Sequence, residues 1–321
     1  MSIVKIQLVT PAPLRFNNGN KITALRWAKI LKQLGHRVSI LQSYDGKPCD
    51  VLIALHARRS YDSIRRFHEL YPQLPLIVIL TGTDLYRDIR THRNAQRSLE
   101  LATHIVALQN MALAELSQHL HAKTQVIYQS AEPCLGRHVA GATRAFQISV
   151  IGHLRQEKDP LRTALAIRGL PKESRIEVRH IGRALDDKLK RRAQIETNRN
   201  PRYRWIGELS HRKTREILAR SDLTVITSHM EGSSNVLSEA LACDVPVIAS
   251  KISGLMGTLG TNYPGYFAAG DTAALTGILS RAETDTRFYR ALKESCKRLS
   301  PLVSPKRESA AWKKLLRQIQ R

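Results

Sequence analysis

Acidic residues are scarce in this sequence of 321 residues: 27 Asp and Glu stand against 51 Lys and Arg, which gives a formal net charge of +24. Such an excess is typical of proteins that bind nucleic acid, acidic membrane surfaces or anionic small molecules, and it also arises on arginine-rich surfaces without a partner. Aromatic residues make up only 5% of the chain, and no helix-turn-helix, zinc finger or basic-aromatic strip occurs. We therefore favour compositional bias combined with anionic small ligands, and we expect no specific nucleic-acid partner.

Cysteine and long apolar runs are scarce as well. The four cysteines form no CxxC pair, which disfavours zinc, and at this chain length no disulfide framework is expected: Cys49, Cys134, Cys243 and Cys296. We therefore expect a reducing, cytoplasmic environment. No apolar run reaches the roughly 18 residues that span a bilayer, and the N-terminal MSIVKIQLVTPAP is typical of a first strand, not of a signal peptide. We expect no stable membrane insertion and at most weak association with anionic surfaces.

Both common nucleotide-binding fingerprints are missing. The sequence has no GxGxxG after a predicted strand and no GxxxxGK followed by Ser or Thr. Their absence disfavours a dinucleotide-dependent oxidoreductase and a P-loop enzyme, and we expect no bound cofactor.

Short β-branched runs alternate with longer amphipathic segments along the whole chain, which predicts an α/β fold built from βαβ units with parallel sheets. Six strands are predicted in the first half, at 3–10, 38–42, 51–55, 76–81, 104–108 and 125–128. Six more are predicted in the second half, at 146–151, 175–181, 203–206, 223–227, 247–249 and 265–267. The clearest helix is ITALRWAKILKQLG, whose predicted apolar stripe is Ile22, Leu25, Ala28, Leu31 and Leu34.

A change of composition divides the chain into two domains. The stretch around 133–145 is rich in Gly, Pro and short side chains and has no periodicity, which is typical of a linker. We predict a first domain over 1–138 and a second over 139–304. The basic amphipathic helix at about 305–321 is a candidate to pack back on the first domain.

The predicted strand FQISVI runs directly into the segment GHLRQEKDP. Gly152 allows the backbone to turn at the end of the strand. Arg155 and Lys158 can then point into the region outside the carboxyl end of the strand, where α/β sheets bind ligands. Taken alone, the segment is equally compatible with a surface loop that carries two ordinary cations.

The segment MEGSSNVLSEALA adds a second feature. Residues 232–235 are predicted to begin a helix with Ser233 or Ser234 as its cap, and the unpaired N–H groups of such a terminus suit a diphosphate. Glu239, about two turns into the helix, can accept two hydrogen bonds from a ribose diol, and Glu231 can reach a sugar ring. One such glutamate would read as a solvated charge, whereas two on either side of this turn indicate a binding site.

These segments resemble the E-x7-E motif and the flanking loops of GT-B glycosyltransferases of family 4. The resemblance implies two facing Rossmann-like domains with a cleft between them, no metal ion, and a nucleotide sugar held mainly by the second domain. WIGELS matches the loop that reads the base. GHLRQEKD matches the diphosphate segment, except that His153 stands where the family usually has Arg, so that Arg155 is expected to take this role. The implied catalytic residues are Glu231, Lys158 and Arg155. The implied donor-binding residues are Gly152, His153, Arg155, Lys158, Gly207, Glu208, Leu209, Gly232, Ser233, Ser234, Asn235 and Glu239.

Cations and hydroxyl groups also follow strand ends in the first half. Asn20 is predicted to cap the first helix, and the segments HARRS and TGTD each follow a predicted strand. We predict a pocket for a small phosphate-like acceptor, formed by Gly19, Asn20, Arg26, His56, Arg58, Arg59, Thr81, Thr83 and Asp84. The remaining arginines of these segments read as surface residues: Arg65, Arg66, Arg90 and Arg93.

Several segments of the first half, including ALHARRS, LTGTDLYRDI and VIYQSAEP, are similar to those of the selenosugar synthase family of selenoneine biosynthesis, which belongs to family 4. The resemblance implies transfer of the sugar of UDP-N-acetylglucosamine, or of UDP-glucose, to selenophosphate. Two alternatives stay open. One is a family 4 enzyme with another acceptor, such as a lipid headgroup, which the charge and the basic last helix suit. The other is a two-lobed module that binds nucleotide sugars or nucleic acid without catalysis.

Overall fold

The computed structural model describes residues 2–11, 19–134 and 145–320. The chain separates into two compact units: unit 1 comprises residues 1–130, 231–235 and 304–321, and unit 2 comprises residues 131–230 and 236–303. Each unit contains one six-stranded sheet in which all paired strands are parallel. The greater part of the predicted linker, 135–144, lies outside the described residues.

The sheet of unit 1 has the strand order β2-β1-β3-β4-β5-β6. Its strands are β1 (Lys5–Val9), β2 (Arg37–Leu41), β3 (Val51–Leu55), β4 (Leu76–Ile79), β5 (His104–Ala107) and β6 (Thr124–Val126). The main helices are α1 (Gly19–Gln33), α2 (Tyr61–Leu70), α4 (Arg93–Leu101) and α13 (Pro305–Ile319), with shorter α3 (Ile89–Thr91) and α5 (Gln118–His121). A π-helix, η1 (Asp84–Asp88), and a 3-10 helix, η2 (Asn110–Glu115), complete the unit.

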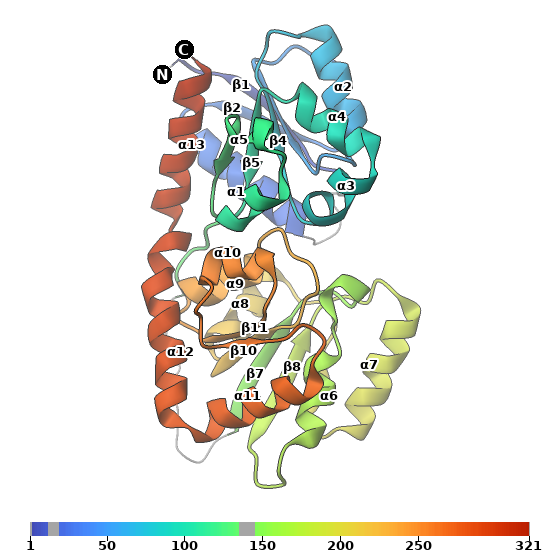
Figure 1. The fold of residues 1–321 in the computed structure, drawn as a ribbon, viewed down its shortest axis with the longest axis vertical. Helices are drawn as coiled ribbons and strands as arrows, with labels where there is room; N and C mark the ends of the chain where they lie inside the picture. Colours follow the sequence, from blue (N-terminus) through green and yellow to red (C-terminus); the bar gives the residue numbers. More distant parts are fainter. Residues whose placement is uncertain (1, 12–18, 135–144, 321) are drawn as a thin grey trace. The chain divides into compact units, whose positions relative to one another are not determined.

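The sheet of unit 2 has the order β12-β11-β10-β7-β8-β9. Its strands are β7 (Phe146–Ile151), β8 (Ile176–Ile181), β9 (Tyr203–Trp205), β10 (Leu223–Ile226), β11 (Val247–Ser250) and β12 (Tyr266–Phe267). The α-helices are α6 (Arg162–Ala166), α7 (Asp187–Arg199), α8 (His211–Ala219), α9 (Asn235–Ala242), α10 (Ser253–Leu259), α11 (Thr272–Thr284) and α12 (Thr286–Leu299). The 3-10 turns are η3 (Gln156–Lys158), η4 (Ile167–Gly169) and η5 (Ser300–Val303). All twelve predicted strands are present, and the predicted pair of Rossmann-like sheets is confirmed (Figure 1).

The C-terminal helix α13 completes the core of unit 1 (Figure 1). The Trp27 and Trp312 rings meet edge to face with their centroids 5.0 Å apart, and both are fully buried. Glu308 anchors the same helix: its carboxylate accepts hydrogen bonds from Trp27 Nε1 at 2.6 Å and from Arg26 Nε at 3.0 Å. The hydroxyl and the amide of Ser130 donate to this carboxylate as well. A buried carboxylate needs such a set of donors, so Glu308 ties the end of the chain to helix α1.

The apolar stripe predicted for helix α1 is partly wrong. Leu25 is 48% exposed, whereas Ala24, Trp27 and Leu31 are fully buried. The buried face is therefore rotated relative to the prediction, because Trp27 fills the space between the sheet and helix α13 and sets the orientation of the helix.

Candidate active site

In unit 2 the two loops with the predicted donor residues lie side by side. Strands β7 and β10 are neighbours although three connections separate them in the chain, and ligands of open α/β sheets bind at such a switch point. The Thr227 hydroxyl, after β10, donates to the Lys158 carbonyl at 2.9 Å. The His229 amide donates to the Glu157 carbonyl, also at 2.9 Å. These bonds hold the loop after β7 against the loop that leads into α9.

The turn at Gly152 is held by neighbours that the sequence analysis did not single out. A side chain at Gly182 would bring its Cβ within 1.9 Å of the Gly152 carbonyl oxygen, so only glycine allows β7 and β8 to end this close together. His180 Nε2 donates to the same carbonyl at 3.2 Å, while its Nδ1 accepts from the Tyr203 hydroxyl at 2.8 Å. Burial lowers the pKa of His180 to about 4, which keeps the ring neutral. Its position in the strand IEVRHI gave no functional signal.

Two predicted cations follow this turn. The side chain of Lys158 runs back past Gly152, with Cδ 4.0 Å from the point where a Cβ on that glycine would lie. Arg155 Nε is buried and has no hydrogen-bond partner among the described residues. Such a donor is costly unless a ligand accepts from it, and an anionic group is the matching ligand. His153, in contrast, uses Nδ1 to accept from the Arg183 amide at 3.0 Å, so this atom stabilises the backbone.

The helix after β10 begins at the last residue of the predicted range 232–235. Helix α9 starts at Asn235, which makes Ser234 the residue before its first turn and leaves Gly232 and Ser233 in the preceding loop. Glu231 and Ser234 are nearly buried, at 7% and 3% exposure. The first turn of α9, the part of the helix whose N–H groups suit a diphosphate, therefore begins at Asn235.

Glu239 lies on the buried face of α9 at 6% exposure. Its Oε1 accepts a hydrogen bond from His211 Nε2 at 2.7 Å, and among the described residues no group donates to Oε2. His211 is the first residue of α8, which Ser210 caps by accepting from the Lys213 amide. Glu239 was predicted from its motif, whereas His211 was not, because the two are 28 positions apart and nothing in the local pattern marks the histidine.

The predicted base-reading loop connects β9 to helix α8. Gly207 has a φ of +76°, which favours glycine, and its carbonyl accepts from the Gly182 amide at 2.8 Å. Trp205 Nε1 donates to the Gly182 carbonyl at 2.8 Å, so the ring closes over the ends of β8 and β9. Glu208 is exposed and Leu209 is half-buried. The assignment of this loop to base reading stays a prediction.

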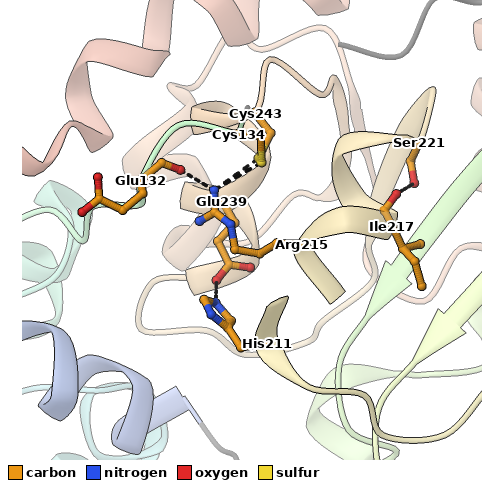
Figure 2. The surroundings of a disulfide bond; sticks show 8 residues. All are labelled: Glu132, Cys134, His211, Arg215, Ile217, Ser221, Glu239 and Cys243. Atoms are coloured by element: carbon orange, nitrogen blue, oxygen red, sulfur yellow. Dashed lines mark hydrogen bonds and ion pairs between the residues drawn. A yellow bond between two sulfur atoms is a disulfide. The ribbon is translucent and has the colours of Figure 1, made fainter. Parts of the chain in front are cut away.

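A disulfide joins Cys134 to Cys243, the residue directly after α9 (Figure 2). The expectation that no cysteines pair is wrong for these two, whereas Cys49 and Cys296 are free and buried. Arg215 Nη2 lies 3.2 Å from the Cys134 sulfur and 3.5 Å from that of Cys243. The bond could not be read from the sequence because the two cysteines are 109 positions apart.

In unit 1 the predicted acceptor residues of the loops after β3 and β4 form a bonded network, whereas Gly19, Asn20 and Arg26 lie in α1. His56 is buried with a φ of +72°, and its Nε2 lies 3.0 Å from the Thr83 hydroxyl. Its Nδ1 accepts from the Arg59 amide at 3.3 Å, so the proton lies on Nε2 and His56 donates to Thr83. Burial lowers the pKa of His56, with the charge of Asp84 opposing the shift. A neutral ring therefore positions the Thr83 hydroxyl.

The Asp84 carboxylate lies at the centre of this network and accepts hydrogen bonds from the surrounding loops. The carboxylate accepts from the amides of Ala57, Thr81 and Gly82 at 2.8–3.0 Å, and the Thr81 hydroxyl donates to it as well. The side chain is fully buried. Asp84 thus serves the backbone of the loops, so its predicted contact with an acceptor has no support in the geometry.

The predicted arginines differ in what they already bind. Arg58 Nη1 lies 3.4 Å from Asp88 Oδ1, whereas the exposed guanidinium of Arg59 has no partner among the described residues. The Nε of Arg26 is used by Glu308, and its Nη2 is buried without a partner among the same residues. The predicted cap at Asn20 is wrong, because the described part of α1 already includes Gly19.

Two features concern the described residues as a whole. No helix in this part of the chain is long and apolar enough to cross a membrane. No group of three or more His, Cys, Asp or Glu side chains within the described ranges is arranged to hold a metal ion.

Comparison with known proteins identifies the fold and the family. Residues 140–299 match the family of glycosyl transferases group 1. HepE of Anabaena, solved in complex with UDP, aligns with 98% of this chain and 100% of its own at a TM-score of 0.78 and 16% identity. Sucrose-phosphate synthase from Thermosynechococcus elongatus aligns with 98% of both chains, also at 0.78 and 16%. A glycosyltransferase from Rickettsia africae covers 100% of both chains at 0.72 and 15%.

The fold is therefore GT-B, with two parallel six-stranded Rossmann-like sheets. The chain is a glycosyltransferase of group 1, by the match over 140–299 in unit 2, which carries most of the predicted donor residues.

Proposed function

We propose that the chain transfers a sugar from a UDP-sugar that binds at the switch point of unit 2. The observation that carries this proposal is the state of Glu239, a nearly buried carboxylate with one oxygen bonded to His211 and the other without a donor among the described residues. A ribose diol supplies the donors that such a carboxylate lacks. The buried Nε of Arg155 lacks an acceptor, which the diphosphate supplies. HepE of Anabaena, a fold relative, has been solved with UDP-glucose, which supports the choice of nucleotide.

Calorimetry with UDP tests the donor assignment. Glu239→Ala removes charge-assisted hydrogen bonds to the ribose and should weaken UDP by about 2–4 kcal/mol, or roughly 30-fold to 1000-fold. An unchanged affinity would remove Glu239 from the site. Glu216→Ala, on the exposed face of α8, is the control that should leave UDP binding intact.

For the acceptor, we propose selenophosphate, with UDP-N-acetylglucosamine or UDP-glucose as donor. The support is the resemblance of the first-half segments to selenosugar synthases, together with the exposed guanidinium of Arg59 and the ordered Thr83 hydroxyl. In the reaction, a selenium lone pair forms a bond to the anomeric carbon. The bond from this carbon to the UDP oxygen breaks, and its electron pair leaves with UDP. Water then attacks phosphorus, the selenium–phosphorus bond breaks with its electron pair on selenium, and phosphate and the seleno-sugar are released.

The selenophosphate acceptor needs little activation because it is already an anion with a nucleophilic selenium. The protein's tasks are placement and stabilisation of the charge that develops on UDP, which we assign to Lys158, Arg155 and the first turn of α9. Glu231 is proposed to hold the sugar ring.

Mass spectrometry of the products from UDP-N-acetylglucosamine and selenophosphate tests the acceptor. We expect UDP and a seleno-sugar that carries the selenium isotope pattern, and no such product when selenophosphate is replaced by inorganic phosphate. UDP release that depends on vesicles with anionic lipid headgroups would instead support the lipid alternative. That alternative is weakened by helix α13, whose apolar residues Trp312, Leu315 and Leu316 are fully buried in unit 1. Tight, salt-dependent RNA or DNA binding without UDP release would favour a binding module.

A further inference from the structure

The hydrogen bond between His211 and Glu239 joins two helices at the candidate ribose site. His211 Nε2 lies 2.7 Å from Glu239 Oε1, and the side chains are 55% and 8% exposed. Figure 2 shows the imidazole of His211 directed at the Glu239 carboxylate. A fully exposed pair of this kind would contribute little, but here the carboxylate is nearly buried, so solvent screens the bond only in part.

The backbone on both sides of this bond is anchored. Four residues after His211, on the same face of α8, Arg215 reaches the sulfur of Cys243, which itself follows Glu239 by four residues. The two contacts, His211 with Glu239 and Arg215 with Cys243, are thus one helical turn apart on both segments. They hold α8 beside α9 over the length of that turn. The Ser210 cap sets the first turn of α8, and the disulfide to Cys134 holds the end of α9 (Figure 2). His211 therefore meets Glu239 from a rigid support.

The bond with His211 gives the two oxygens of the Glu239 carboxylate different roles. An ionised carboxylate offers about four acceptor positions on two oxygens. His211 occupies one position on Oε1 and leaves Oε2 to a ligand. Without His211 the carboxylate could rotate about its last bond, and that freedom would have to be lost when a ribose binds. A single orientation is what two neighbouring hydroxyl groups need for simultaneous contact.

We propose that His211 is a positioning residue for the ribose of the donor: it orients Glu239 so that the enzyme recognises the 2′,3′-diol. This inference rests on the proposed function, in which Glu239 binds the ribose. His211 acts through Glu239 and does not itself contact the nucleotide. The residue thus sets specificity for ribonucleotide sugars over their deoxy analogues.

Calorimetry with UDP and with 2′,3′-dideoxy-UDP tests the proposal. His211→Ala should weaken UDP about fivefold to tenfold, the usual effect of losing one hydrogen bond, and should leave dideoxy-UDP unchanged because it has no diol. His211→Gln places an amide N–H near the position of Nε2 and should restore most of the UDP affinity. Arg212→Ala is the matched control, since that side chain is 82% exposed and pairs with Glu216.

The double variant His211→Ala/Glu239→Ala separates this inference from the proposed function. If His211 acts through Glu239, adding His211→Ala to Glu239→Ala should cause no further loss of UDP affinity. A further loss, an equal weakening of UDP and dideoxy-UDP, or no effect of His211→Ala would overturn the inference while the ribose role of Glu239 stands. If Glu239→Ala alone leaves UDP affinity unchanged, both proposals fall. Thermal melting of each variant verifies that it is folded.

Discussion

In unit 2, polar groups at the carboxyl ends of the strands are held in place but keep unused bonding positions, whereas in unit 1 most of the corresponding groups bond to one another. Arg155 Nε and Glu239 Oε2 lack protein partners among the described residues. Asp84, in contrast, accepts from three backbone amides and a hydroxyl, and Arg58 is paired with Asp88. Unsatisfied but ordered groups indicate a ligand, and satisfied groups indicate structure.

The two units also differ in the interactions that hold their loops and helices in place. Unit 2 contains a disulfide. Its candidate ribose site lies between helices α8 and α9, and the disulfide holds the end of α9. Unit 1 relies on buried carboxylates, Glu308 and Asp84, each with several donors. A variant in one unit therefore tests whether the polar groups of that unit bind a ligand or stabilise the fold.

Reduction of the disulfide should give the largest effect. The bond between Cys134 and Cys243 closes a loop with a sequence separation of 109, and the loss of unfolded-state constraint predicts a stability decrease of about 5 kcal/mol. Urea unfolding with and without dithiothreitol measures the difference. Cys134→Ser/Cys243→Ser should match the reduced protein and be insensitive to dithiothreitol, and pulse proteolysis should assign the loss to unit 2. Equal stability of oxidised and reduced protein would contradict a cross-link.

Lys158→Ala should have the next largest effect, on the donor side. If Lys158 stabilises the charge that builds on the departing UDP, kcat should fall about a hundredfold with a smaller change in KM. Steady-state rates at varied UDP-sugar measure both. If only KM changes, Lys158 binds the donor equally in the ground and transition states, and the leaving-group assignment is wrong. Lys172→Ala provides a control at a surface lysine of the same unit.

Much of the fold could be predicted because parallel strands leave a strong local signal. Most of the twelve strands appear in the sequence as short runs rich in β-branched residues, and the predicted ends of all twelve differ by only a few residues from the observed ones. The apolar face of α1 was less accessible to prediction. Leu25 is on the exposed side because Trp27 packs on Trp312, a contact with a helix that lies at the other end of the sequence.

The same limit applies to the sites. Glu239 and Lys158 stand in short segments with a recognisable spacing, whereas His180, Gly182 and His211 reach their partners through the fold. In unit 1, sequence reasoning counted Asp84 as a ligand contact because a carboxylate after a strand can serve either role. Only the positions of three amide groups around it distinguish the two.

The buried His180 should make unit 2 sensitive to acid. Its pKa is lowered from 6.5 to about 4 by burial, so above pH 6.5 the ring is neutral in both the folded and unfolded states. As the pH falls below 6.5 the unfolded chain binds a proton and the folded chain does not. Stability is therefore lost, by about 2 kcal/mol at pH 5.

Urea unfolding of wild type and His180→Gln at pH 7 and pH 5 isolates this contribution. Gln keeps an N–H donor for the Gly152 carbonyl but does not titrate, so the variant should lose less stability between the two pH values. His119→Gln, at an exposed histidine of unit 1, should retain the wild-type pH dependence. An equal loss in wild type and His180→Gln would show that His180 does not titrate as its burial requires.

The smallest expected effect distinguishes the two neighbouring arginines of unit 1. Arg59→Ala should raise the KM for selenophosphate about tenfold, because its guanidinium has no partner among the described residues and an anion would supply one. Arg58→Ala should have a smaller effect, since Arg58 already pairs with Asp88. UDP affinity should be unchanged in both variants, and Arg59→Lys should restore only part of the loss, because a point charge replaces a planar fork. Arg93→Ala, at an exposed residue of α4, is the control.

If Arg58→Ala has the larger effect, the pair with Asp88 orients the Arg58 guanidinium toward the acceptor, and residues of unit 1 that already have protein partners contact the acceptor after all. If neither variant changes KM, both arginines belong to the solvated surface, and unit 1 would use its polar strand ends for stability alone.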